Sequence, residues 1–412
     1  MLLNESPVVT RRHYWIVVLC WAGWVFDFYD LILYSFLLIP IGEEFHFTKQ
    51  QLSWVYSLTL LMTGAGGIVF GLLADRYGRK RVLQWTIVAY CLGTFLCAFT
   101  HRFWWLLFWR AVTGLGVGGE WGVGHALISE TFPAGKRGRY GAWMQSGAPI
   151  GVGLAAIMGA FFAPHFGWRT TFAVSALPAM MVILIRRFLP ESDVWIKHQA
   201  AGSLPPYWKL FGELFTRRYL RITVLAFVLT CMNMCAYWFT YSWFPGYLKE
   251  DKALSIAQSG WWTLAIVAGE LVGYTTFGVL SDRWGRRKAF TIFAWLMAAG
   301  LGTISLAWQF FYALPLALLL LMVLTGVGTG TWSNFGPMFS ELFPTRIRST
   351  ALNAIYNLAR ATQFVTPVLI ASLSVYYGLV VGIWLGAIFS FLAGVWIWLL
   401  PEAKGRAITA DQ

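Results

Sequence analysis

Apolar runs of about 20 residues recur along the whole chain, and short polar segments separate them. A helix of that length rises far enough to cross the ~30 Å hydrocarbon core of a bilayer. We therefore predict an all-α, polytopic membrane protein, because soluble folds and β-barrels lack continuous apolar runs of this kind. The pattern predicts twelve spans, at residues 15–40, 51–74, 82–100, 103–128, 141–163, 169–189, 221–248, 258–281, 288–308, 312–339, 350–375 and 378–400.

The longest polar gap, 190–220, divides these spans six to six. Its adjacent prolines and mixed charges are typical of a linker. The predicted organisation is an N-terminal six-helix bundle (1–190), a cytoplasmic linker (191–220), a C-terminal six-helix bundle (221–402) and a cytoplasmic tail (403–412).

The net charge of +13 suggests nucleic acid at first, but the positions of the charges exclude it. Of the 31 Lys and Arg, 24 lie in alternate polar segments, including both termini, 5 lie in the other loops, and two, Arg110 and Arg360, lie within spans. This asymmetry predicts that both termini are cytoplasmic. We expect a multi-pass protein of the cytoplasmic (inner) membrane whose pathway one monomer can supply.

The two halves repeat one another. "GLLADRYGRK" at Gly71 matches "GVLSDRWGRR" at Gly278, and "GLGVG" at Gly114 matches "GVGTG" at Gly326. "SETFPAGKR" and "SELFPTRIR" match at an offset of 211, as do "LPES" and "LPEA". Four matches in the same order indicate two related bundles that face one another, with a binding site near the midplane between them.

These motifs resemble those of the major facilitator superfamily over residues ~14–402. "GLLADRYGRK" carries that family's loop motif without a mismatch, and "RAVTGLGVG" from Arg110 looks like its fourth-span motif. The resemblance implies a secondary transporter whose loops form a conformational latch; the alternative is a basic loop that only sets topology. The implied latch residues are Gly71, Asp75, Arg76, Gly78, Arg79, Asp282, Arg283, Gly285 and Arg286.

Within the latch, each residue type suggests a task. Gly71 allows close helix packing, and Gly78 allows a turn that disfavours a side chain. Asp75 can accept hydrogen bonds from arginines and from the amides that begin a helix.

Two shorter stretches narrow the resemblance. "FDFYD" in the first span is similar to a pattern of sialate:proton and aromatic acid:proton symporters, with Tyr29 in place of an aromatic of that pattern. "GVGGEWG" at 116–122 is similar to a stretch of metabolite:proton and sialate:proton symporters. The sialate:proton group offers both patterns, and these groups mostly import organic anions with protons.

Ionisable residues inside spans are costly, so each should face a cavity or a partner. Asp27 and Asp30 share one helix face, and two close carboxylates resist joint ionisation, as a proton-coupling site requires. The alternative is that one of them only accepts hydrogen bonds. Arg110 either forms a structural ion pair with an acid of the first span or modulates the proton acceptor. Glu120 is either a second protonatable site or a packing carboxylate.

Arg360 is the candidate for binding an anionic substrate, since a guanidinium offers two parallel donors to a carboxylate. Asn353, Asn357 and Gln363 continue its stripe on the same helix. The alternative is that Arg360 pairs with Glu270. Tyr237, Tyr241 and Asn233 form a similar stripe on the seventh span, which either lines the cavity or packs.

We therefore expect proton-coupled uptake of a small organic anion, such as a carboxylate or acidic sugar, by alternating access. The open alternatives are an exporter or antiporter, a passive facilitator and a transporter-like sensor. An enzyme is disfavoured because no nucleophile motif with a base appears. The five cysteines have no metal-ligand spacing, and no cofactor is expected besides the coupling proton.

Overall fold

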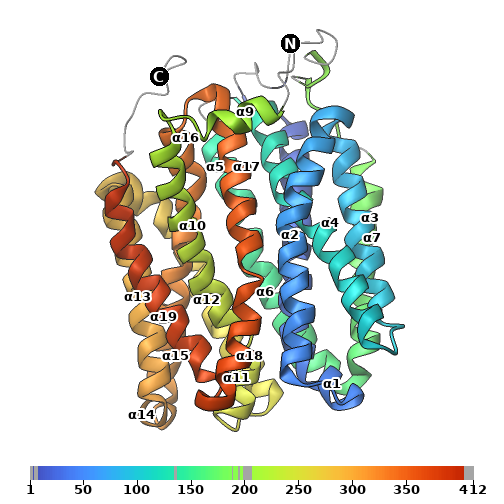
Figure 1. Ribbon diagram of the computed structural model, residues 1–412, viewed down its shortest axis with the longest axis vertical. Coiled ribbons are helices and arrows are strands. Elements are labelled where there is room, and N and C mark those ends of the chain that lie inside the picture. The colour runs from blue at the N-terminus through green and yellow to red at the C-terminus, as the bar shows by residue number, and fades with distance from the viewer. Residues whose placement is uncertain are drawn as a thin grey trace.

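Long helices run side by side from one end of the molecule to the other in the computed structural model (Figure 1). The structure describes residues 3, 8–133, 137–187, 189–193, 195–197 and 207–402. The first half contains α1 (Arg11–Phe45), α2 (Lys49–Tyr77), α3 (Arg79–Cys97), α4 (Phe103–Thr131), α5 (Arg137–Gln145), α6 (Gly147–Ile157), the π-helical turn η3 (Met158–Phe162) and α7 (Ala163–Arg186).

The second half follows the short helix α9 (Tyr207–Glu213), which lies at the end of the bundle where α1 begins (Figure 1). Its elements are α10 (Leu220–Tyr241), α11 (Phe244–Glu250), α12 (Ile256–Trp284), α13 (Arg286–Leu306), α14 (Trp308–Tyr312), α15 (Pro315–Gly328), the 3-10 turn η4 (Thr329–Asn334), α16 (Phe335–Leu342), α17 (Thr345–Thr362), α18 (Val365–Tyr377), α19 (Val380–Trp396) and η5 (Ile397–Leu399).

The helices agree with the predicted twelve spans. Within the described residues, 9 segments are long and apolar enough to cross a membrane. The helices α3 and α4 add two more spans, and Gly167, with φ 78°, divides the segment Trp143–Leu177 into the fifth and sixth. The limits of the predicted domains stay predictions: of the linker, 194 and 198–206 lie outside the described residues, as does the whole tail, 403–412.

The same local signals begin and end equivalent helices in the two halves. Thr48 and Ser255 cap α2 and α12 by accepting hydrogen bonds from the amides of Gln51 and Gln258, at 3.2 and 3.1 Å. Both helices end at a glycine with positive φ, Gly78 at 98° and Gly285 at 97°, where other residues would be strained. The internal repeat of the sequence is therefore also a repeat of the structure.

Several spans predicted as continuous are interrupted, among them 312–339 and 350–375. In span 312–339 the 3-10 turn η4 separates α15 from α16, and in span 350–375 the chain leaves the helix between α17 and α18. Pro367 explains the second break, because it has no amide hydrogen and its ring clashes with the carbonyl four residues earlier, at Gln363. Breaks of this kind near the bilayer midplane mark binding sites in many transporters.

The two bundles meet along α2 with α17 and α18, and along α6 with α12. Most of the buried charged and polar side chains predicted as functional lie near these contacts or just inside the first bundle.

Candidate functional site

The predicted N-terminal latch forms a connected polar network. The Arg79 guanidinium lies 2.9 Å from Asp75 and 2.8 Å from Glu130, and it also donates to the carbonyl of Ala74 at 2.7 Å. Glu191 accepts hydrogen bonds from the backbone amides of Arg79 at 2.9 Å and Lys80 at 3.2 Å, so it caps the start of α3. The latch thus ties α2, α3 and α4 to the segment that follows the sixth span.

The second half repeats this network residue for residue. Arg286 lies 2.8 Å from Asp282 and 2.9 Å from Glu341. Glu402 accepts from the amides of Arg286 and Arg287 at 2.9 and 3.2 Å, as Glu191 does in the first half. The matched "E-x-F-P" and "LPE" motifs therefore supply the acids of both latches, a role that the sequence analysis missed although the repeat had marked those positions.

Two details of the latch prediction are wrong. Asp75 does not accept from the amides that begin a helix, since Glu191 occupies those amides in the first latch. Gly71 does not permit a close helix approach, because no atom lies within 4 Å of where its side chain would be. Arg76 and Arg283 are exposed.

The two aspartates of the first span have different surroundings. Asp30 accepts from Arg110 at 2.7 Å and from Thr94 at 2.5 Å, and the Arg110 guanidinium lies 5.0 Å from the Tyr34 ring centroid. Arg110 therefore forms the ion pair with the first span that was one of its two predicted alternatives. Asp27, one turn earlier and fully buried, has no hydrogen-bond partner on either carboxylate oxygen among the described residues.

Glu120 pairs with Arg186, which the sequence analysis counted only among the 24 Lys and Arg of the alternate polar segments. Arg186 is fully buried at the end of α7 and donates to Glu120 and, at 3.2 Å, to the carbonyl of Leu83. Thr86 also donates to Glu120, at 2.9 Å. The basic residue counted as a topology signal is thus part of a second buried ion pair of the first bundle.

Arg360 lies on the last turn of α17 and is 2% exposed. Neither of its terminal nitrogens has a partner among the described residues, and its guanidinium lies 5.6 Å from the Trp24 ring centroid on α1. Asp27 is close enough for an electrostatic interaction but makes no ion pair with it. Asn357 is also buried, with both amide atoms unpartnered in the described part of the chain. We call Asp27, Asn357, Arg360 and Gln363 the central site.

Gln363 lies at the break between α17 and α18. Its amide nitrogen donates to the carbonyl of Ala359 at 3.1 Å, whereas its side-chain oxygen has no partner in the described part of the chain. Asn353, on the same helix, lies against Gly122 of α4. The predicted stripe on this helix is therefore directed at the first bundle.

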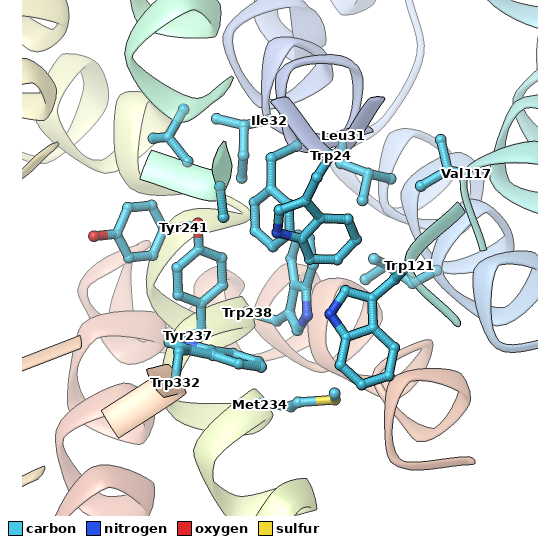
Figure 2. Close-up of a cluster of buried hydrophobic side chains, with 14 of the residues drawn as sticks. Trp24, Leu31, Ile32, Val117, Trp121, Met234, Tyr237, Trp238, Tyr241 and Trp332 are labelled. Carbon is cyan, nitrogen blue, oxygen red and sulfur yellow. The ribbon is translucent and has the colours of Figure 1, made fainter. Parts of the chain in front are cut away.

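Aromatic side chains from both halves gather in one buried cluster, as Figure 2 shows for Trp24, Trp121, Tyr237, Trp238 and Trp332, and Trp24 connects this cluster to Arg360. Trp121 of α4 stacks on Tyr356 of α17, with ring centroids 3.8 Å apart and an interplanar angle of 14°. Tyr237 contacts Phe28 across the interface at 6.0 Å. We call these aromatic side chains at the contact between the halves the aromatic wall; it includes Tyr237 and Tyr241.

Two polar side chains of the seventh span, Asn233 and Tyr241, form hydrogen bonds within the second half. Asn233 accepts from Thr331 at 2.8 Å, and its amide nitrogen has no partner among the described residues. Tyr241 donates to Glu270. The alternative that Glu270 pairs with Arg360 is therefore wrong, because Glu270 is bound to Tyr241 and makes no ion pair with Arg360.

Two ion pairs join the halves at the end opposite the latches. Lys49 lies 2.5 Å from Glu250, and Lys249 lies 3.5 Å from Glu43. The first half supplies the cation of one pair and the anion of the other.

A sequence model described as the Major Facilitator Superfamily matches residues 19–255 and again 226–411. The chain belongs to the major facilitator superfamily. It is 33% identical over 398 residues to a metabolite transport protein of Haemophilus influenzae whose name is provisional, covering 94% of this chain and 96% of that one. It is 30% identical to the sialic acid transporter NanX of Escherichia coli, over 89% of this chain and 88% of that one.

The solved structures give the same fold for this superfamily member. A partially occluded, inward-open xylose transporter from E. coli superposes with a TM-score of 0.79 at 18% identity, covering 97% of this chain and 100% of that one. The predicted all-α fold of twelve helices in two related bundles is confirmed. The prediction that the chain is a transporter and not an enzyme is confirmed as well.

Proposed function

We propose that the chain is a proton-coupled symporter that takes up a small organic anion by alternating access. Arg360 carries this proposal, because a buried guanidinium whose terminal nitrogens have no partner in the described part of the chain calls for an anion. It projects from the second bundle toward Trp24 of the first, so an anion bound to it would contact both halves. Alternating access needs its substrate at this position.

The substrate class follows from the surroundings of Arg360 and from the relatives. The named cargoes of relatives include sialic acid, gentisate and cis,cis-muconate, all of which carry carboxylates. A guanidinium can bind a carboxylate through two parallel hydrogen bonds. Asn357 and Gln363 offer further polar contacts, and the aromatic wall suits an apolar or planar body.

Charge balance at the central site supplies the coupling to protons. Asp30 and Glu120 each have an arginine of their own, whereas Asp27 makes no ion pair with a described residue and interacts electrostatically with Arg360 and, more weakly, with Arg186. A substrate carboxylate on Arg360 brings a second anion close to Asp27. Because two carboxylates facing one guanidinium in a low dielectric resist joint ionisation, Asp27 takes up a proton when the substrate binds.

The latches then hold or release the predicted cytoplasmic end, and the ion pairs Lys49–Glu250 and Glu43–Lys249 do so at the other end. The distribution of Lys and Arg supports an inner-membrane orientation with both termini cytoplasmic. The whole pathway lies within one chain, so a monomer suffices.

Transport assays in proteoliposomes test this function. A thermal-shift screen at two pH values first selects a ligand among sialic acid, gentisate and cis,cis-muconate. The symporter accumulates the labelled acid when the outside is acidified, and an uncoupler abolishes the accumulation. Accumulation driven by an acid interior indicates an antiporter, equilibration that ignores the uncoupler indicates a facilitator, and no flux with any acid indicates a sensor.

The variant Asp27→Asn is expected to lose proton-driven accumulation and to retain exchange of labelled for unlabelled substrate. Asparagine cannot bind the coupled proton, but the variant keeps Arg360 available to the substrate. Asp251→Asn is a matched control, because this exposed carboxylate accepts from the amide of Val380, at 2.8 Å, and lies outside the central site. Undiminished accumulation in Asp27→Asn would show that Asp27 does not carry the proton.

A further inference from the structure

Glu270 is a buried acid that the coupling scheme above does not use. It lies in the middle of α12, is 1% exposed and accepts a hydrogen bond from the hydroxyl of Tyr241 on α10. Asp30 and Glu120, at similar burial, are each held by an arginine. Glu270 makes no ion pair with any described residue, so nothing balances its charge.

The elements packed around Glu270 bring no cation to it. Helix α12 packs against α15, η4, α6 and η3, and their described residues include no Lys or Arg. The charged groups of α11 and α13 lie at the ends of the bundle, where Lys249 and Glu250 pair with Glu43 and Lys49, and Arg286 pairs with Asp282. The titratable groups that face Glu270 are three tyrosines, Tyr237, Tyr241 and Tyr274.

Tyr241 links Glu270 to the aromatic wall. Its ring stacks on that of Tyr237, with centroids 4.2 Å apart and an interplanar angle of 14°. Tyr237 in turn contacts Phe28 of the first bundle and, at 5.7 Å, Trp332 of η4. A change in the hydrogen bond between Glu270 and Tyr241 can therefore shift Tyr237, which lies at the interface of the halves.

We propose that Glu270 is a second proton-binding site of the transport cycle and that its protonation releases the Tyr241 hydroxyl to donate to the substrate. This inference rests on the proposed symport. It assigns the two carboxyl groups different tasks: Asp27 compensates the charge of the substrate, and Glu270 controls a hydrogen-bond donor in the aromatic wall.

The proton step involves one O–H bond and one reversed hydrogen bond. While Glu270 is a carboxylate, it can only accept, and the Tyr241 hydroxyl is committed to it. A proton from the outer solution forms an O–H bond on Glu270, and this new group can donate to the oxygen of Tyr241. The Tyr241 hydrogen is then free for a substrate carboxylate, and the proton leaves Glu270 after the substrate has been released inside.

Two protons per cycle have an electrical consequence. A monovalent anion that enters with two protons carries one net positive charge inward, so a negative interior accelerates uptake. In Glu270→Gln the neutral amide keeps an acceptor for Tyr241 but binds no proton. We expect the proton-to-substrate ratio to fall from about two to about one, and the response to membrane potential to disappear.

The experiment measures proton entry with a trapped pH dye and substrate entry with labelled gentisate or sialic acid, in the same proteoliposomes, at fixed membrane potentials. Tyr274→Phe is the matched control, because it removes a neighbouring hydroxyl of α12 and leaves the bond between Tyr241 and Glu270 intact. A ratio that is the same in Glu270→Gln and wild type overturns the inference and leaves the symport standing. Wild-type uptake without proton entry overturns the symport itself.

A second measurement needs no substrate. Infrared difference spectra between acidic and alkaline protein should contain the C=O band of a protonated carboxyl group that is absent in Glu270→Gln and shifted in Tyr241→Phe, which lacks the hydroxyl bound to Glu270. A spectrum in which Glu270→Gln retains every carboxyl band of the wild type contradicts a proton on Glu270. This readout also separates proton binding from a merely structural role of the residue.

Discussion

Replacing Arg360 by alanine is expected to weaken substrate binding strongly while leaving the fold as stable as before, or more stable. A hydrogen bond to a charged group contributes about 1.5–3 kcal/mol. Loss of the guanidinium should therefore reduce affinity roughly 10- to 150-fold, since 1.4 kcal/mol corresponds to a factor of ten. Stability does not fall because the terminal nitrogens of Arg360 form no hydrogen bond with a described group, and Asp27, which loses the field of Arg360, can take up a proton instead of remaining a buried anion.

Weaker binding together with retained stability would distinguish a substrate-binding role of Arg360 from a structural one. Thermal unfolding without ligand should show an unchanged or higher Tm, and the ligand-induced increase in Tm should disappear. Arg360→Lys should recover only part of the affinity, because an ammonium cannot donate two parallel hydrogen bonds. Arg102→Ala, at an exposed position before α4, serves as the control. Normal affinity in Arg360→Ala, or a lower Tm, would mean that Arg360 serves the fold and not the substrate.

The fold could be predicted from the sequence because its signals are local and repeated. Apolar runs mark the spans, and the offset of 207 that relates the loop motifs also relates Gly78 to Gly285, whose positive φ ends α2 and α12. The broken helices were missed because hydropathy is blind to backbone geometry. Pro367 was the available signal for the break before α18.

The central site could be predicted only as a set of residue types. Spacing placed Asp27 and Asp30 on one face. Only Asp30 forms an ion pair, because its partner Arg110 lies 80 residues further along the chain, which spacing could not show. Arg186 was missed because it lies at the end of a span, where a basic residue is usually a topology signal. Its partner Glu120 is 66 residues away in the sequence, and nothing in local pattern connects the two.

The pair Glu120–Arg186 yields the second large expected effect, on stability. Removing one partner of a buried ion pair typically costs about 3–5 kcal/mol, because the other charge is left uncompensated. Arg186→Met and Glu120→Gln should therefore each lower the free energy of unfolding substantially. The first should do so by the larger amount, since it strands a carboxylate that keeps, among the described residues, the hydrogen bond from Thr86 alone. The two buried ion pairs of the first bundle, Asp30–Arg110 and Glu120–Arg186, would then rank among its principal polar restraints.

The double variant Glu120→Gln/Arg186→Met separates stability from coupling. It removes both charges, so its loss of stability should be smaller than the sum of the single losses, which a double-mutant cycle in detergent measures by denaturant unfolding. Glu120 was predicted either to carry a proton or to pack, and its hydrogen bonds with Arg186 and Thr86 favour the packing alternative. If the double variant folds and still accumulates substrate with protons, Glu120 is a structural acid. If it folds and transports without protons, the proton passes through Glu120, and the task assigned to Asp27 would have to be reassigned.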